Sequence, residues 1–163
     1  MDRLWTPWRY QYISGAGGEK KDDSACIFCD IAADPANDER NFVLHRAPRN
    51  FVLLNLYPYT SGHLMIVPYE HVPDLDALRQ ETAHELIDLA QRAQSVLREA
   101  YRPEGFNFGI NLGRAAGAGV AGHVHLHALP RWAGDANYMT TVGETRVLPE
   151  DLPMTYERLR GKF

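Results

Sequence analysis

The sequence has little of what marks several common protein classes. Its 163 residues include only two cysteines, too few for a disulfide framework in a chain of this length. No apolar run approaches the roughly 20 residues of a transmembrane helix, and the first residues lack the apolar segment of a signal peptide. We therefore expect neither a secreted nor a membrane protein, and we predict a cytoplasmic location, in a reducing cytosol.

Charge of one sign is not in excess either. Lys and Arg number 17 against 21 Asp and Glu, which gives a net charge of −4 with neutral histidines. This balance argues against non-specific binding of nucleic acid, while 45% apolar residues argue against disorder. A single domain over residues 1–163 is predicted. Within it we expect an N-terminal arm with a Gly-rich loop at 1–25, a core at 26–135 and a C-terminal tail at 136–163.

Apolar periodicity predicts a sheet interrupted by one long helix. Runs rich in β-branched and aromatic residues predict strands at 42–46, 50–55, 63–67, 106–111 and 123–129. From Asp74, a plausible N-cap, to residue 101 the apolar residues recur at steps of three and four, as on one face of a helix. Residues 26–33 and the tail each have room for a shorter helix. This order predicts an α+β fold with a five-stranded antiparallel sheet.

The strand at 123–129 contains three histidines in strict alternation. Side chains alternate between the faces of a strand, so His123, His125 and His127 share one face, about 6.5–7 Å from one another. The residues between them then point into the core: Val124, Leu126 and Ala128. Three imidazoles pack poorly in an apolar core, so we interpret this strand as a functional site.

A glycine-rich loop at 112–122 directly precedes the histidine strand. Its small residues expose backbone N–H groups, which can cradle an anion. Neutral imidazole is a good nucleophile near neutral pH and also serves as acid or base. The two features together suggest a phosphate group held next to a histidine nucleophile.

The motif at 123–129, His-Val-His-Leu-His-Ala-Leu, resembles the signature of the histidine triad (HIT) family of nucleotide-binding proteins. The resemblance continues at 26–29, from Asn55 to His71, and at Asn111. The segments that look most like the branch with bacterial diadenosine tetraphosphate phosphorylases are 4–9, 55–59 and 130–135; the Fhit-like hydrolases are similar. The resemblance implies a HIT-like fold with one long and one shorter helix, in a homodimer whose sheets are continuous.

The resemblance also implies a role for each site residue. His125 is the nucleophile, which attacks the α-phosphorus and forms a nucleotidyl-imidazole, and a backbone carbonyl fixes its tautomer. His127 and His63 contact the phosphates or the leaving group. The remaining nucleotide contacts implied are Asn55 at the ribose hydroxyls and Asn111, Gly117, Ala118 and Gly119 at phosphate oxygens. Residues 117–122 lack the Ser, Thr or Gln side chains of many relatives, so backbone or water must bind phosphate there.

The activity implied is nucleotidyl transfer from a dinucleoside polyphosphate, of the diadenosine tetraphosphate class, to water or to phosphate. Two alternatives remain open: a Hint-like nucleoside phosphoramidase, and a nucleotide-binding protein with little turnover. The expected partners are a small adenine mono- or dinucleotide and a second copy of the chain, or more copies. Neither nucleic acid nor a membrane is expected as a partner.

Cys26 and Cys29 have the Cys-x-x-Cys spacing that lets two thiolates share one metal ion. By spacing alone the pair also fits a redox motif or two buried apolar side chains. Some HIT proteins bind zinc through such a pair, the histidine of a Pro-x-x-His segment and the first triad histidine. Here these histidines are His71 and His123, so the resemblance implies a structural zinc site that leaves His125 for chemistry.

Overall fold

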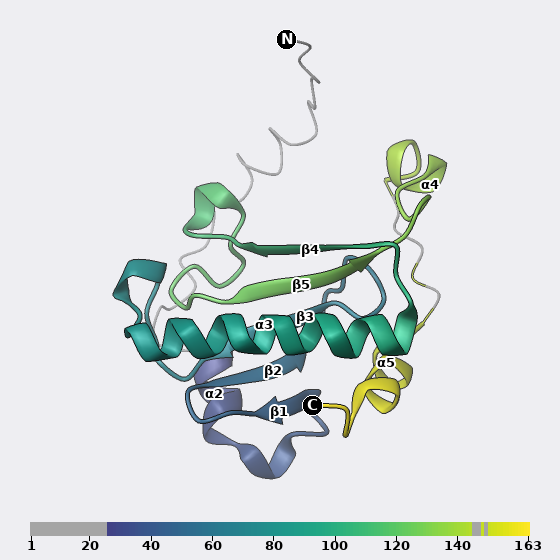
Figure 1. The fold of residues 1–163 in the computed structure, drawn as a ribbon. Coiled ribbons are helices and arrows are strands. Elements are labelled where there is room, and N and C mark those ends of the chain that lie inside the picture. Colours follow the sequence, from purple (N-terminus) through teal and green to yellow (C-terminus); the bar gives the residue numbers. More distant parts are fainter. Residues whose placement is uncertain (1–25, 145–147, 149) are drawn as a thin grey trace.

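The computed structural model describes residues 26–144, 148 and 150–163, and the expected N-terminal arm lies outside them. A five-stranded antiparallel sheet forms the centre of the protein, with the strand order β1-β2-β3-β5-β4 (Figure 1). The strands are β1 (Val43–Arg46), β2 (Asn50–Leu54), β3 (Leu64–Pro68), β4 (Gly105–Ile110) and β5 (Leu126–Arg131). The predicted α+β class and the five-stranded sheet are confirmed.

Helices cover both faces of this sheet. The long helix α3 (Gln80–Tyr101) lies across one face and the short helix α2 (Ile27–Ala33) lies on the other (Figure 1). The remaining helical elements are η1 (Pro35–Asn37), η2 (Leu75–Ala77), η3 (Arg114–Ala116), α4 (Tyr138–Thr141) and α5 (Leu152–Leu159). None of the helices in the described part of the chain is long and apolar enough to cross a membrane.

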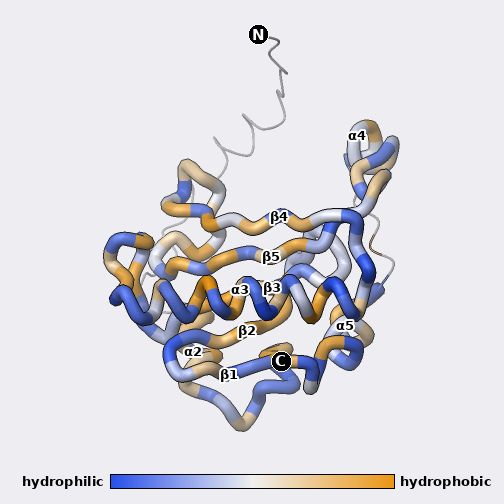
Figure 2. The backbone as a smooth tube through the Cα atoms, in the orientation of Figure 1, coloured by the Kyte–Doolittle hydropathy of each residue, from blue (hydrophilic) through white to orange (hydrophobic). Residues whose placement is uncertain are grey.

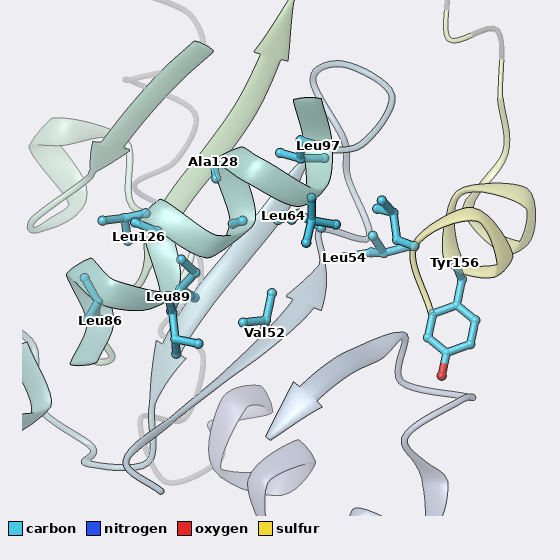
Figure 3. Packing of buried hydrophobic residues seen from close by; sticks show 14 residues of the cluster. Val52, Leu54, Leu64, Leu86, Leu89, Leu97, Leu126, Ala128 and Tyr156 are labelled. Carbon is cyan, nitrogen blue, oxygen red and sulfur yellow. The ribbon is translucent and has the colours of Figure 1, made fainter. Parts of the chain in front are cut away.

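Alternation along the strands gives each face of the sheet its own apolar cluster, and the tube in Figure 2 shows apolar residues along the strands. The strand residues that pack against α3 are Val52, Leu54, Leu64, Ile66, Leu126 and Ala128 (Figure 3). The cluster on the α2 side comprises Phe28, Ile31, Val43, Phe51, Leu53, Met65 and Val67. Leu126 and Ala128 thus face the core as predicted, and His127 between them faces the α2 side.

Helix α3 starts later than predicted. The sequence placed its start at Asp74, but that residue precedes only the short turn η2 and makes no side-chain capping bond. The α-helix begins at Gln80, after an extended linker. A carboxylate oxygen of Glu70 accepts a hydrogen bond from the hydroxyl of Thr82 in the first helical turn. The helix start is therefore supported from a distant segment, which a local capping pattern does not reveal.

Strand β5 is displaced toward the C-terminus relative to the predicted strand at 123–129. Its pairing with β3 begins at Leu126, and its pairing with β4 continues through Pro130 to Arg131. The predicted end of this strand at residue 129, just before Pro130, is therefore wrong. Beyond Ala128 the strand pairs only with β4 among the described strands, and a proline without an N–H group is tolerated at such an edge.

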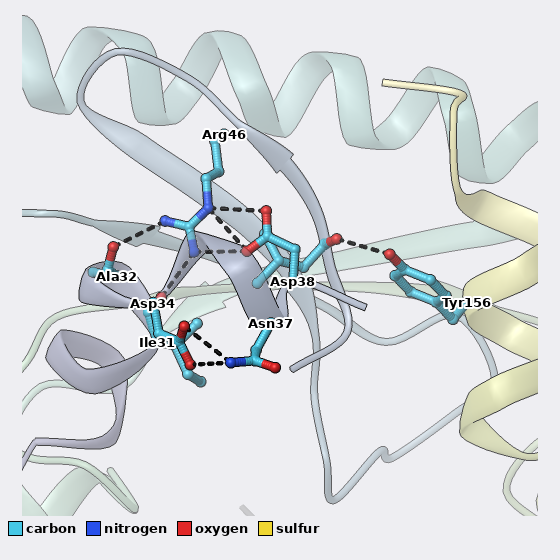
Figure 4. A network of polar contacts seen from close by, with 8 residues as sticks. Ile31, Ala32, Asp34, Asn37, Asp38, Arg46 and Tyr156 are labelled. Carbon is cyan, nitrogen blue, oxygen red and sulfur yellow. Dashed lines mark hydrogen bonds and ion pairs between the residues drawn. The ribbon is translucent and has the colours of Figure 1, made fainter. Parts of the chain in front are cut away.

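The C-terminal tail is an integrated part of the fold. Helix α5, which matches the short helix expected there, is capped by Asp151, whose side chain accepts from the N–H of Met154 at 2.9 Å. Tyr156 and Leu159 on this helix belong to the apolar cluster beneath α3. The Tyr156 hydroxyl also donates to the carbonyl oxygen of Val43, 3.3 Å away (Figure 4).

Arg46 ties helix α2 to the sheet (Figure 4). Its guanidinium donates to both carboxylate oxygens of Asp38 at 2.7–3.0 Å. It also donates to the carbonyl oxygens of Ile31, at 2.8 Å, and Ala32, at 3.1 Å. The last carbonyls of a helix have no partner within the helix. Arg46 supplies a donor to both, in addition to the Asp34 N–H that donates to Ile31 at 3.2 Å. Because α2 carries Cys29, the same contacts hold the cysteine segment against the sheet.

Replacing Arg46 is expected to destabilise the fold. Arg46→Ala leaves two helix-end carbonyls and the Asp38 carboxylate without this donor, and we expect it to lower the free energy of unfolding by about 2–3 kcal/mol. Urea denaturation followed by circular dichroism measures the change. Arg40→Ala, at an exposed arginine nearby, serves as the control. Equal stability of the two variants would show that the network is dispensable.

Candidate active site and metal centre

Histidines gather along the α2 side of β5 and at the ends of its neighbours. Five of the seven in the sequence take part: His63, His71, His123, His125 and His127. The rings of His125 and His127 lie 4.9 Å apart between centroids. Phe28 of α2 packs against two of the rings, at 5.4 Å from His123 and 5.0 Å from His125. The predicted triad therefore shares one face, with the aromatic ring of Phe28 against it.

His125 is held in one tautomer. Its Nδ1–H donates to the carbonyl oxygen of His123 at 2.8 Å, which leaves the Nε2 lone pair unprotonated. Burial lowers the pKa of His125, so the ring is neutral near pH 7. The result is an oriented nitrogen nucleophile, because neutral imidazole attacks through its unprotonated nitrogen.

A chain of hydrogen bonds sets the tautomers of His63 and His127. The backbone N–H of Tyr59 donates to Nδ1 of His63 at 3.1 Å, so the proton of that ring is on Nε2. This Nε2–H donates to Nδ1 of His127 at 2.9 Å, which leaves the His127 proton on its own Nε2. Burial, together with the neighbouring His125, lowers the pKa of His127 to about 4. His127 is thus a neutral ring that presents an N–H donor beside the nucleophile.

The two asparagines expected to contact nucleotide lie at opposite sides of the histidines. Asn55 is buried, with its Nδ2 3.3 Å from Nδ1 of His63 and its Oδ1 accepting from the N–H of Tyr57. Asn111 directly follows the last residue of β4, which pairs with Leu126 at the start of β5. Asn55 is therefore in contact with the site, and Asn111 lies near the start of the histidine strand.

The glycine-rich loop uses part of its own backbone. The N–H of Gly117 donates to the carbonyl of Arg114 at 3.0 Å, and that of Ala118 donates to Gly113 at 3.3 Å. The N–H of Gly119 makes no hydrogen bond to the backbone of the described residues. Of the three predicted backbone donors to phosphate, only Gly119 is thus available without rearrangement of the loop. The positive φ of Gly113 and Gly117 (73° and 88°) forms the turn that produces this arrangement.

The four predicted zinc ligands lie together. One ligand atom from each of Cys26, Cys29, His71 and His123 lies within 4.8 Å of the others. The Sγ of Cys26 is 3.3 Å from Nδ1 of His123, and the Sγ of Cys29 is 3.2 Å from Nδ1 of His71. Tetrahedral zinc, with bonds of about 2.3 Å to sulfur and 2.0–2.1 Å to nitrogen, separates such atoms by about 3.6 Å. The donor set and its spacing therefore fit a zinc ion.

The surroundings of His123 favour metal binding through Nδ1. Its Nε2–H donates to the carbonyl oxygen of Pro68 at 2.9 Å, which turns the unprotonated Nδ1 toward the two thiols. Burial lowers the pKa of His123, so the ring is in the neutral form that coordinates metal. Burial and the neighbouring Cys26 raise the pKa of Cys29 to about 11. A divalent cation displaces that proton, so binding here has to weaken as the pH falls.

Comparison with known proteins identifies the family. The model of the HIT domain matches residues 37–134. The chain belongs to the HIT domain family. An AP-4-A phosphorylase of Mycobacterium tuberculosis is 40% identical over 167 aligned residues, which cover 100% of this chain and 85% of that protein. A bis(5'-adenosyl)-triphosphatase of Dictyostelium discoideum is 39% identical over 82 residues, half of this chain and 54% of that protein. By this likeness the chain is an enzyme of the HIT family.

Solved HIT structures share its fold. A Zn-bound histidine triad family protein from Mycobacterium smegmatis superposes with a TM-score of 0.68 at 28% identity, and covers 86% of this chain and 94% of its own. A member of the HIT family from Bacillus subtilis gives 0.61 at 27% identity, over 79% of this chain and 90% of its own. The first of these is a zinc protein of the family, which agrees with the donor set found here.

Two site residues were not identified from the sequence. The sequence assigns no role to Tyr59, yet its N–H orients His63, and its ring centroid lies 4.8 Å from that of His63 and 6.2 Å from that of His127. Phe28, which lies between the two cysteines in the sequence, also has no predicted role. The sequence does contain one signal for this contact, which is the position of Phe28 within the Cys-x-x-Cys segment. A metal site that joins this segment to His123 also brings Phe28 against the triad.

Metal analysis tests the Cys₂His₂ site. We expect about one zinc per chain in protein prepared without chelators or a metal-affinity tag. Cys26→Ser should release the metal and lower Tm by about 5 °C or more, because zinc binding contributes to folding. His125→Ala, two residues from His123, should do neither. Zinc content near zero, with a Cys26→Ser variant as stable as the parent, would show that the cysteines bind no metal and only pack as apolar side chains.

Proposed function

We propose that this HIT protein cleaves dinucleoside polyphosphates of the diadenosine tetraphosphate class through a covalent nucleotidyl-histidine at His125. The observation that carries the proposal is the pair of oriented rings. His125 offers an unprotonated Nε2, and His127 beside it offers an Nε2–H donor. The name of the mycobacterial relative, AP-4-A phosphorylase, supports the substrate class.

In the first step the Nε2 lone pair of His125 attacks the α-phosphorus. A P–N bond forms, and the bond from that phosphorus to the bridging oxygen breaks. The departing polyphosphate carries the electron pair of the broken bond, and the Nε2–H of His127 is placed to donate to it. Since both rings start neutral, His125 becomes a cationic nucleotidyl-imidazolium. The polyphosphate leaves as an anion that is stabilised by the hydrogen bond from His127, because a neutral imidazole keeps its ring proton.

In the second step an acceptor attacks the same phosphorus and releases His125. Water as acceptor yields AMP, and inorganic phosphate as acceptor yields ADP. The hydrogen bond from His125 to the carbonyl of His123 persists through both steps, because only Nε2 reacts. Asn55 at the ribose and Asn111 with the Gly119 N–H at the phosphates are the proposed nucleotide contacts.

Zinc, when bound by Cys26, Cys29, His71 and His123, supplies structural cross-linking and takes no part in the proton transfers. It joins the α2 segment to the residue whose carbonyl orients His125. A closed four-ligand site has no open position for substrate.

A nucleoside phosphoramidase is the second candidate. The observation that favours it is again the Nε2–H of His127, because an amine leaving group needs a proton more than a polyphosphate does. An adenosine phosphoramidate cleaved faster than diadenosine tetraphosphate would select this alternative. Tight nucleotide binding without turnover of either compound would select a binding protein.

Product analysis tests the leading proposal. With diadenosine tetraphosphate we expect ATP together with AMP in phosphate-free buffer, or with ADP when phosphate is the acceptor. His125→Ala should lower kcat by at least about a thousandfold, as loss of a nucleophile does. The matched control is His84→Ala, at an exposed histidine of α3. Activity of His125→Ala within tenfold of the parent would rule out the covalent route.

We also propose a homodimer formed through β4. This strand is one edge of the sheet, and Phe108 on it is 39% exposed. Unpaired edges favour pairing with another chain, and pairing of two β4 strands would make the sheets continuous. Light scattering at tens of micromolar should give the mass of a dimer or a larger assembly. Phe108→Glu should shift the protein toward monomer, and a monomeric parent would contradict the assembly.

A further inference from the structure

The two cysteines lie in the first turn of α2, on the face of the sheet that carries the histidines. Cys26 is the N-cap residue of this helix, and the turn closes with a hydrogen bond from the N–H of Asp30 to the carbonyl of Cys26 at 3.0 Å. Neither cysteine forms a disulfide in this structure, and the two sulfurs lie within 4.8 Å of each other. The chain has no third cysteine, so Cys29 is the one possible disulfide partner of Cys26 within a chain.

A short movement of this turn brings the two sulfurs together. Residues three apart on a helix have Cβ atoms about 5–6 Å apart, whereas a disulfide needs about 3.5–4.5 Å. Cys26 has extended backbone angles (φ −108°, ψ 114°) and makes no side-chain capping bond. No capping bond is therefore lost when its side chain turns toward Cys29. The pair that can share a metal ion can thus form a disulfide instead.

The Cys29 side of the metal cluster faces solvent. Cys29 is half-buried, and its Sγ lies 3.2 Å from Nδ1 of the exposed His71. Cys26 contacts the inner side of the cluster, where its Sγ is 3.3 Å from Nδ1 of His123, a residue that is 1% exposed. A small polar oxidant therefore reaches Cys29 first. Fully buried structural cysteines are inert, and this pair lacks that protection.

Phe28 lies between the two cysteines and connects them to the triad. It is 4% exposed, and its ring packs on those of His123 and His125, with centroids 5.4 and 5.0 Å away. At the other end of α2 the last carbonyls are bound by Arg46, so that end is anchored without the cysteines. A rearranged first turn therefore moves Phe28 and frees the ring of His123, whose carbonyl orients His125.

We propose that Cys26 and Cys29 are a site of reversible oxidation. A peroxide converts the two side chains from metal ligands into a disulfide, and the loss of the metal slows the chemistry at His125. Only this effect on activity rests on the proposed function. Thiols bound to a metal ion are deprotonated, and the thiolate is the nucleophilic form of cysteine. Because thiols exchange with disulfides, a thiol reductant and zinc reset the site.

The reaction balances with hydrogen peroxide as the oxidant. The Cys29 sulfur attacks one peroxide oxygen, the O–O bond breaks and hydroxide leaves, which yields a sulfenic acid. The Cys26 thiolate then attacks the Cys29 sulfur, so that an S–S bond forms, the S–O bond breaks and a second hydroxide leaves. The two sulfurs together lose two electrons, and the peroxide gains them. Metal binding needs the thiolates, so the two remaining histidines release the ion.

Peroxide treatment of the zinc-loaded protein tests the site without relying on activity. We expect hydrogen peroxide to release about one zinc per chain, measured with a coloured zinc indicator, while both thiols disappear from a thiol assay. Peptide mass mapping should place the disulfide between Cys26 and Cys29. Over the same time course kcat/KM for diadenosine tetraphosphate should fall at least about tenfold, and dithiothreitol with added zinc should restore it.

Two variants separate the cysteines from other targets of peroxide. Met139 and Met154 are exposed and can form sulfoxides, which thiol exchange does not reverse. The double variant Met139→Leu with Met154→Leu should release zinc as the parent does. Cys29→His keeps four side chains of kinds that bind zinc, but it cannot form the disulfide. It should retain its zinc and its starting activity under the same treatment.

Metal release and disulfide formation have to occur together. A parent that cannot be loaded with zinc, zinc that stays bound under peroxide, or zinc released without the disulfide overturns the site. A Cys29→His variant that binds zinc and loses it as readily as the parent also overturns it. If that variant does not fold, diamide replaces it, as a thiol oxidant that adds no oxygen. Diamide should release zinc from the parent with the same disulfide, and zinc retention overturns the site.

The activity measurement keeps this inference separate from the proposed function. A disulfide and released zinc with unchanged turnover would overturn the effect on His125, while the transfer activity stands. If the zinc-loaded parent cleaves no dinucleotide before oxidation, the proposed function fails. Zinc release together with the mapped disulfide then still supports the oxidation site, and the absence of either overturns it.

Discussion

The hydrogen bond from Nδ1–H of His125 to the carbonyl of His123 joins the two halves of the site. It spans 2.8 Å and fixes which nitrogen of His125 is unprotonated. The carbonyl that accepts it belongs to the residue that completes the Cys₂His₂ cluster. The position of the proposed nucleophile therefore depends on how firmly His123 is held, through Pro68, the cysteines and His71. Helix α2 contributes as well, because Arg46 holds its end against the sheet.

The two-residue period of a strand separates functions that lie close together. Going along the chain, His123 faces the two cysteines and His71, whereas in the proposed mechanism His125 carries the reacting nitrogen and His127 carries the donor to the leaving group. Hydrogen bonds place the ring proton on Nδ1 of His125 and on Nε2 of His123 and His127. His123 therefore presents an unprotonated Nδ1, His125 an unprotonated Nε2 and His127 an N–H group. On the other face, Leu126 and Ala128 pack beneath α3 and hold the strand in register.

Much of this site could be predicted from the sequence, because its main signals are local. Alternation placed three histidines on one face, and the resemblance to HIT proteins pointed to the four metal ligands. Other features depend on distant contacts that have no local pattern. The start of α3 is supported by Glu70, nine residues before Arg79. The Gly117 and Ala118 amides bond within their own loop, and the hydroxyl of Tyr101 at the end of α3 donates to Glu150, 49 residues further along the chain.

The proposed covalent step is tested most directly by capture of the intermediate. The parent enzyme is mixed rapidly with diadenosine tetraphosphate and quenched in base, where a phosphorus–nitrogen bond to histidine survives, and its peptides are analysed by mass spectrometry. An adenylyl group on His125, formed at least as fast as the enzyme turns over, is the predicted result. Its absence during active turnover, or its presence on His63 or His127 instead, would contradict the assignment of His125 as the nucleophile.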